Sequence, residues 1–252
     1  MLTLYFDNSL QELLTRRYRK NRIVHYPLVR RASIKDICES LHIPHTEIWK
    51  ITRGSEELSF THIPCAGERI ALHSFPFGTD VTRPTLLRPE PLPSPAFTVD
   101  VNVGKLARLL RMAGIDTWYK SQVSESALAK ESAAEGRILL TRNRDLLQRK
   151  IIVWGRLVRS ERPVAQLAEI ISLYGLGQQI APFSRCLECN GLLQSVDKSS
   201  ILHLLEPLTK KYYHRFKRCP DCGRIYWQGS HHQHMLNILE QQHLCRENRI
   251  QS

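Results

Sequence analysis

The sequence predicts an α/β protein with more than one domain, and three observations lead to this prediction. Residues 96–183 alternate short apolar strands with amphipathic helices, which is the pattern of a parallel sheet covered by helices. Residues 184–235 contain two Cys-x-x-Cys pairs, which are typical of a metal-stabilised ribbon. Residues 1–79 contain several strand-like segments around one helix. A chain of 252 residues is long enough for two or three such domains.

Composition narrows the class of protein. The hydrophobic fraction of 42% excludes wholesale disorder, and no apolar run approaches the roughly 20 residues of a membrane span, so we expect no membrane partner. The first residues lack a basic region followed by an apolar stretch, so we expect no secretory signal and a cytoplasmic location. The net charge of +12 is spread along the chain and favours a polyanion, nucleic acid foremost. Many basic proteins bind no nucleic acid, so charge alone leaves both interpretations open.

Residues 1–79 are predicted to form a small β-grasp, ubiquitin-like domain. Strands are expected at 2–6, 22–28, 47–54, 57–63 and 69–75. A helix follows Ser33, whose spacing to Asp36 resembles a capping box, and Pro44 ends it. Such a domain could recruit a protein partner. Three histidines in it are expected to lie on the surface or to be satisfied by neighbours rather than to bind metal: His42, His45 and His62.

Two further segments lack a periodic pattern. Residues 80–95 are rich in proline and are predicted to be a semi-extended linker. The tail, residues 236–252, is polar and carries no recognisable functional motif. The segment between the two cysteine pairs is polar and is expected to be helical.

The core, residues 96–183, is predicted to be a Rossmann-type parallel sheet. Strands are expected at 96–103, 115–120, 137–141 and 151–155. Helices are expected at 104–114, 124–136 and 163–176. In such sheets the functional crevice lies at the carboxyl ends of the strands. Four side chains are predicted to reach that edge: Asp100, Glu125, Asn143 and Asp145.

This polar cluster predicts a metal-dependent hydrolytic site. Three carboxylates in one crevice repel one another unless they bind a cation, and Mg²⁺ or Mn²⁺ prefers carboxylate oxygen. Such an ion can activate water and stabilise the leaving oxygen of a phosphodiester. Arg142 and Arg144 flank the cluster and could hold phosphate. The alternative is that the acidic residues only cap the helices that follow the strands.

Four of the seven cysteines form two pairs and predict a closed tetrahedral Zn²⁺ site with a structural role. They are Cys186, Cys189, Cys219 and Cys222. Spacing of this kind, with Cys38, Cys65 and Cys245 left single, favours a reducing compartment over a disulfide framework.

The segment 210–218 interleaves basic residues with aromatic rings, which suits phosphates and unpaired bases. The predicted RNA contacts in the ribbon are Lys210, Lys211, Arg215, Lys217, Arg218 and Arg224. The nearby rings are Tyr212, Tyr213, Phe216, Tyr226 and Trp227, which could equally pack a small core. His231, His232 and His234 could form a second metal site, although such clusters are more often solvated surface.

Four stretches together resemble one known family. They are FTVDVNVGKLARLLRMAGIDTWY, ESAAEGRILLTRNRDLL, RCLECNGLL and CPDCGRIYWQGSHHQHM, and they resemble the Mut-seven C-terminal RNase domain family over residues 96–235. That family is a branch of PIN-like nucleases with a zinc ribbon. Residues 1–79 resemble the ubiquitin-like domain that precedes this module. The resemblance implies a metal-dependent ribonuclease in which Asp100, Glu125 and Asp145 match the family's acidic positions.

Asn143 departs from the family pattern, which has aspartate at this position as TRD. An amide oxygen can bind a metal but brings no charge. Two hypotheses follow: a ribonuclease that uses Mg²⁺ or Mn²⁺, or a non-catalytic RNA-, ribosome- or ribonucleoprotein-associated protein with a degenerate site. An adaptor recruited through the ubiquitin-like domain is a third.

Overall fold

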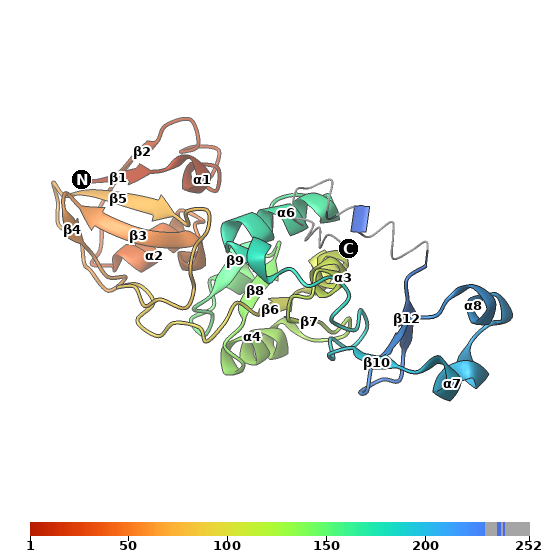
Figure 1. Ribbon diagram of the computed structural model, residues 1–252. Coiled ribbons are helices and arrows are strands. Elements are labelled where there is room, and N and C mark those ends of the chain that lie inside the picture. The colour runs from red at the N-terminus through yellow and green to blue at the C-terminus, as the bar shows by residue number, and fades with distance from the viewer. Residues whose placement is uncertain (230–235, 238, 240–252) are drawn as a thin grey trace. The chain divides into compact units, whose positions relative to one another are not determined.

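The computed structural model describes residues 1–229, 236, 237 and 239 (Figure 1). The described residues form two compact units: unit 1 consists of residues 1–103 and 120–159, and unit 2 consists of residues 104–119 and the described residues from 160 onward. The chain has the mixed α/β character that the sequence predicts. No described helix is both long enough and apolar enough to cross a membrane.

A five-stranded sheet forms the N-terminal part of unit 1, in the order β2-β1-β5-β3-β4. Its strands are β1 (Leu2–Phe6), β2 (Ile23–Tyr26), β3 (Ile48–Arg53), β4 (Glu56–Glu57) and β5 (Arg69–Ser74). The central pair, β1 and β5, is parallel and the other pairs are antiparallel, as in a β-grasp domain. The strand predicted at 57–63 is wrong beyond Glu57, because β4 ends there.

Helix α2 (Ile34–Ser40) covers one face of this sheet (Figure 1). Ser33 and Asp36 form the predicted capping box, and Ile34, Ile37 and Cys38 are buried. Because the apolar residues recur at helical spacing, the helix places one stripe against the sheet. The short helix α1 (Asn8–Gln11) was not predicted from the sequence; Asp7 caps it.

Three parallel strands form the second part of unit 1. They are β6 (Phe97–Val99), β8 (Ile138–Thr141) and β9 (Gly155–Leu157), with β8 paired to both of the others. Every residue of β6 and β8 is buried, as expected for strands covered on both faces. Helix α4 (Glu125–Ala134) contacts β6 and β8.

Two of the predicted strands have different bounds in this sheet. The strand predicted at 96–103 ends at Val99, and a 3-10 turn, η2 (Val101–Val103), follows. The strand predicted at 151–155 begins only at Gly155, where its pairing with β8 starts. Ile151 and Val153 are exposed while Ile152 and Trp154 are buried, so residues 151–154 form a loop that packs one side against unit 1.

A buried carboxylate connects the N-terminal domain to strand β9. Glu47, in the 3-10 turn η1 (His45–Glu47), is 0% exposed. Arg156 Nη1 donates to its Oε2 at 2.8 Å and the Leu157 backbone N–H to its Oε1 at 2.7 Å. His45 Nε2 lies 2.8 Å from the Ile152 carbonyl and its Nδ1 lies 2.7 Å from Glu39. His45 is therefore a satisfied histidine, as predicted.

The proline-rich segment 80–95 is packed along unit 1 rather than free. Arg88 is 1% exposed and donates hydrogen bonds to the carbonyls of Thr46, Ile48 and Val153. Its guanidinium lies over the ring of Trp154, 5.0 Å from the centroid. The segment is thus an ordered connection within this unit, and the prediction of a semi-extended linker does not describe its packing.

Unit 2 contains two helices that pack together and a small antiparallel sheet. Helix α3 (Gly104–Met112) contacts α6 (Pro163–Leu173). The other elements are β7 (Thr117–Trp118), η3 (Leu176–Gln179), α7 (Lys198–Ile201), η4 (Leu202–Leu204) and α8 (Pro207–Tyr212). Strands β10 (Gln194–Val196), β11 (Phe216–Arg218) and β12 (Ile225–Trp227) form the ribbon sheet in that order. Ile201, Leu205 and Phe216 form its core.

Candidate functional site

We call the four side chains that were predicted to reach the carboxyl edge of the sheet, Asp100, Glu125, Asn143 and Asp145, the strand-end cluster of unit 1. Asp100 directly follows β6, and Thr141 ends β8. Asn143 precedes the short helix α5 (Arg144–Leu147), and Glu125 is the first residue of α4. The parallel pairing of β6 and β8 brings segments 40 residues apart to one edge of the sheet, as the sequence predicts.

Asp100 is a buried carboxylate with two side-chain donors. It is 6% exposed. Its Oδ2 accepts from Thr141 Oγ1 and from Asn102 Nδ2, both at 2.6 Å. Asn102 in turn accepts the Arg142 backbone N–H at 3.1 Å. Hydrogen bonds to an ionised acceptor are short and strong, so this network holds Asp100 in one orientation. Asn102 and Thr141 were not predicted as site residues; only their pairing across the two strands reveals them.

Both polar atoms of the Asn143 side-chain amide form hydrogen bonds. Its Oδ1 accepts the backbone N–H groups of Asp145 at 3.0 Å and Leu146 at 3.3 Å, so it caps α5. Its Nδ2 donates to Glu125 Oε1 at 2.8 Å. An aspartate here could still cap the helix, but it would face Glu125 with a second negative charge. The asparagine therefore removes a repulsion that a bound cation would otherwise have to offset.

Glu125 is exposed and already has a cationic neighbour. Arg149 Nη2 lies 3.0 Å from its Oε2. Asp145 is exposed on α5. Among the described residues, only the four cysteines form a group of three or more metal-ligand side chains whose ligand atoms lie within 4.8 Å of one another. The oxygen donors of the strand-end cluster thus suit Mg²⁺ or Mn²⁺ by chemistry, but their spacing is not that of an assembled metal site.

Of the two arginines predicted to hold phosphate here, one has another role. Arg144 Nη1 donates to the carbonyls of Leu13 at 2.6 Å and His42 at 3.3 Å, so its guanidinium binds the N-terminal domain. Burial lowers the pKa of Arg144, and the neighbouring Arg19 and Arg159 lower it further. Arg142 is exposed next to Asn143 and remains a candidate for phosphate contact.

The four cysteines of unit 2 converge as the sequence predicts. All four Sγ atoms lie within 4.8 Å of one another. Cys186 and Cys222 are 3.5 Å apart, and Cys189 and Cys219 are 3.3 Å apart. Gly191 follows the first pair where a side chain would clash with Asp221 and come within 3.1 Å of Cys219 Sγ. Four thiolates so placed can hold a structural zinc ion.

The electrostatics around Cys186 favour its thiolate. Burial raises the pKa of this thiol, but the hydrogen bond from Tyr226 and the backbone N–H groups of Cys189 and Glu188 lower it to about 6 overall. The Tyr226 hydroxyl lies 3.1 Å from Cys186 Sγ and accepts the Leu187 N–H at 3.0 Å. Hydrogen bonds of this kind orient a ligand from outside the metal's own coordination shell.

A buried arginine anchors the first cysteine pair to helix α3. Arg111 Nη1 donates to the carbonyls of Leu187 at 3.1 Å and Glu188 at 2.6 Å, and its Nε donates to Thr117 at 2.9 Å. Asn190 adds hydrogen bonds to the Thr117 N–H and Asp116, both at 3.0 Å. Sequence reasoning missed Arg111; the one available signal was a charged residue beside the apolar face of α3.

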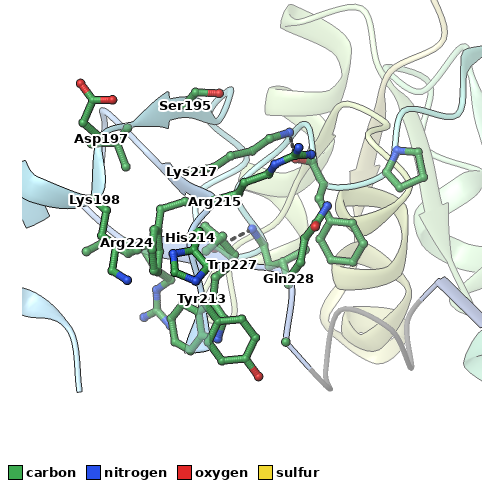
Figure 2. A pocket seen from close by; sticks show the side chains of 18 of the residues that line it. Ser195, Asp197, Lys198, Tyr213, His214, Arg215, Lys217, Arg224, Trp227 and Gln228 are labelled. Carbon is green, nitrogen blue, oxygen red and sulfur yellow. Dashed lines mark hydrogen bonds between the residues drawn. The ribbon is translucent and has the colours of Figure 1, made fainter. Parts of the chain in front are cut away.

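A groove of about 1050 Å³ lies on the ribbon within unit 2 (Figure 2). Three of the predicted RNA contacts line it: Arg215, Lys217 and Arg224. Lys210, Lys211 and Arg218 are not among the residues that line it. His231, His232 and His234, the alternative second metal site, lie outside the described residues, as does most of the predicted tail.

Two family models match the chain. The Mut7-C RNAse domain matches residues 95–239, and the Mut7-C ubiquitin model matches residues 1–77. The resemblance predicted from the motifs is thereby confirmed for both segments and in the predicted order. Neither a curated protein nor a solved structure matches the chain.

Proposed function

The chain belongs to the Mut7-C RNAse domain family, and from this premise we propose that it binds RNA and hydrolyses phosphodiester bonds at the strand-end cluster. One observation carries the proposal. Asp100 is a buried carboxylate, held by Thr141 and Asn102 at the carboxyl end of a parallel strand. This is the place where open α/β sheets position their chemistry, and a carboxylate held so firmly suits a reacting centre better than a helix cap.

In this proposal Asp100, Glu125 and Asp145 hold Mg²⁺ or Mn²⁺, with the amide of Asn143 as a neutral contact. The bound ion would supply activated water and stabilise the leaving oxygen. Thr141 and Asn102 keep Asp100 oriented. Glu125 would have to exchange its contacts with Asn143 and Arg149 for the ion. Arg142 would hold a phosphate of the substrate.

The test is cleavage of end-labelled single-stranded RNA by the zinc-loaded chain, with Mg²⁺, Mn²⁺ or no added divalent ion. A chelator is avoided because it would also remove zinc from the cysteines. We expect divalent-dependent cleavage that Asp100→Asn lowers by about 100-fold or more, the usual weight of a positioned catalytic group. Glu135→Gln, at the opposite end of α4 from Glu125, is the matched control. Cleavage that Asp100→Asn leaves intact would reject this site.

A second candidate function is RNA binding without cleavage, by a nuclease fold that keeps its RNA partner and has lost its chemistry. The observation in its favour is that Glu125 is already satisfied by Asn143 and Arg149, so the cluster is partly neutralised without a metal. Under this alternative the chain retains RNA in every divalent ion and cleaves in none. Asp100→Asn would then leave RNA affinity unchanged.

The ubiquitin-like domain suggests protein interactions. Because the Glu47 and Arg88 contacts anchor this domain within unit 1, we propose that it offers a partner only the surface those contacts leave open. Ribosome or ribonucleoprotein association and a cytoplasmic location belong to the same proposal. Sucrose-gradient co-sedimentation of the full chain tests it, with Val29→Asp and Phe77→Asp as variants that place a charge on exposed apolar residues of the domain. Partners that are kept by both variants would exclude these surfaces as the recruiting element.

A further inference from the structure

The groove on the ribbon combines positive charge with aromatic surface. Its basic lining comes from several elements of unit 2: Arg108, Lys198, Arg215, Lys217 and Arg224. Figure 2 shows Lys198, Arg215, Lys217 and Arg224 with the rings of Tyr213, His214 and Trp227 among them. Asp197 is the acidic residue of the lining. Cations beside rings suit a ligand that carries both phosphates and flat apolar surface.

Trp227 is fixed in position but keeps part of its ring exposed. It lies at the end of β12 and is 39% exposed. Its ring centroid lies 6.5 Å from that of the buried Phe216 and 6.3 Å from that of Tyr213. A side chain at Gly229 would come within 3.0 Å of Trp227 Nε1. The ring is thus supported from the ribbon side and presents the rest of its surface to the groove.

The cations differ in how far neighbours already engage them. Arg108 and Arg224 form ion pairs with the same carboxylate, Glu188, at 3.8 and 3.7 Å, so one negative charge faces two positive ones. Ion pairs between exposed side chains are weak. Lys217 Nζ donates to the Phe183 carbonyl at 2.9 Å, and this neutral acceptor does not cancel the charge of the ammonium group. Arg215 is exposed between Tyr213 and Lys217. The groove therefore keeps a positive potential next to the Trp227 ring.

We propose that this groove is a second RNA site, in which an unpaired base stacks on Trp227 while Arg215 and its neighbours bind the flanking phosphates. The choice of RNA rests on the proposed function. The same chemistry would accept single-stranded DNA, but a duplex hides its base faces and offers nothing for Trp227 to stack on. A groove of this kind implies that the substrate class is single-stranded RNA. In this proposal the groove binds the RNA, and the strand-end cluster cleaves it.

The test uses the full zinc-loaded chain with Asp100→Asn, so that bound RNA stays intact, and fluorescence anisotropy of labelled oligonucleotides. The probes are a single-stranded RNA, the matching single-stranded DNA and the RNA duplex. Trp227→Leu should weaken single-stranded RNA binding by about 10-fold or more, the weight of one stacked base. Trp227→Phe should keep affinity within a few-fold because it keeps a ring. Tyr212→Leu, an aromatic residue that is 61% exposed outside the groove, is the matched control.

Arg215→Ala should weaken binding several-fold and lower the log–log salt slope by about 0.7, the loss of one phosphate contact on a single strand. Lys211→Ala, on α8 outside the groove lining, should change neither by as much. Zinc content measured for each variant shows whether the ribbon is intact. If Trp227→Leu unfolds the ribbon, quenching of tryptophan fluorescence by RNA replaces the affinity measurement on that variant. The quenching should be present in the parent and largely lost in Trp227→Phe.

Two outcomes would overturn the proposal that the groove binds single-stranded RNA. The first is an equal loss of RNA affinity in Arg215→Ala and Lys211→Ala, together with undiminished quenching in Trp227→Phe. The second is binding of the RNA duplex as tight as binding of the single strand. Tighter binding of single-stranded DNA than of RNA would assign the groove to DNA and reject the RNA proposal. None of these results depends on cleavage. A chain that binds through the groove but never cleaves would refute the proposed hydrolysis alone.

Discussion

The cysteine centre of unit 2 and the strand-end cluster of unit 1 are both polar sites built from four residues, but they differ in how their ligands are held. The four thiols lie within 4.8 Å of one another and need a cation to offset their mutual repulsion when ionised. In the strand-end cluster, Asp100 and Glu125 already accept hydrogen bonds from neutral side chains. The first site is therefore organised for a metal, whereas the second is organised largely by the protein itself.

The largest expected effect is on the cysteine centre. Cys189→Ser, or removal of zinc by a chelator, should unfold the ribbon, because structural zinc contributes about 10–16 kcal/mol in comparable small domains. The measurement is zinc stoichiometry, with limited proteolysis of the ribbon. Cys65→Ser, an exposed cysteine outside the centre, is the control and should keep one zinc ion per chain. A ribbon that resists proteolysis without zinc would remove the difference between the two sites.

The next effect concerns unit 1, whose strand β9 depends on the buried carboxylate of Glu47. Glu47→Ala should cost about 3–5 kcal/mol of unfolding free energy, because it removes the buried carboxylate that Arg156 Nη1 contacts at 2.8 Å. Glu12→Ala removes a surface partner of Arg159 and should cost at most about 1 kcal/mol. Urea denaturation measures both. Equal costs would mean that the buried contact between η1 and β9 does not stabilise the unit.

A smaller effect should separate the scaffold of the cysteine centre from its ligands. Arg111→Met keeps much of the side-chain volume but leaves the carbonyls of Leu187, Glu188 and Thr117 without their donor. We expect a loss of about 1–3 kcal/mol, together with weaker zinc retention in competition with a chromogenic chelator. Arg108→Met, on the exposed side of α3, is the matched control. Unchanged zinc affinity would show that the four thiols organise the site alone.

The smallest expected effect is on the strand-end cluster, where one substitution should make stability depend on a bound cation, as we expect for the cysteine centre. Asn143→Asp keeps the α5 cap but places a second negative charge beside Glu125. Without divalent ions we expect a loss of about 1 kcal/mol or less, since Glu125 is exposed. Mg²⁺ or Mn²⁺ should restore it, seen as a rise in melting temperature that is larger than the rise in the parent chain. Asn143→Ala, which loses the cap at a cost of about 1 kcal/mol, should respond to the ions no more than the parent does. The comparison fails if parent and Asn143→Asp respond alike.

The sequence by itself determined the features that depend on short spacing. Two cysteine pairs, each followed within two residues by a glycine, predicted the metal centre and its four ligands. The Ser33–Asp36 capping box and the apolar stripe of α2 followed from helical periodicity. The buried strand β8 and the polar residues after it followed from a run of apolar residues that ends abruptly. In these cases, groups that interact are near one another along the chain, so local patterns carry the information.

Only the tertiary structure decided which distant groups meet. The strand bounds at β4 and β9 depend on pairing with other strands. The residue patterns at 57–63 and 151–155 could not reveal where that pairing begins and ends. Arg144 was predicted to hold phosphate, yet it donates to Leu13 across 131 residues of sequence. The partner of Asn143, Glu125, lies 18 residues away on another helix. Hydrogen bonds of this kind exist only once the chain has brought their donors and acceptors together, so no spacing in the sequence encodes them.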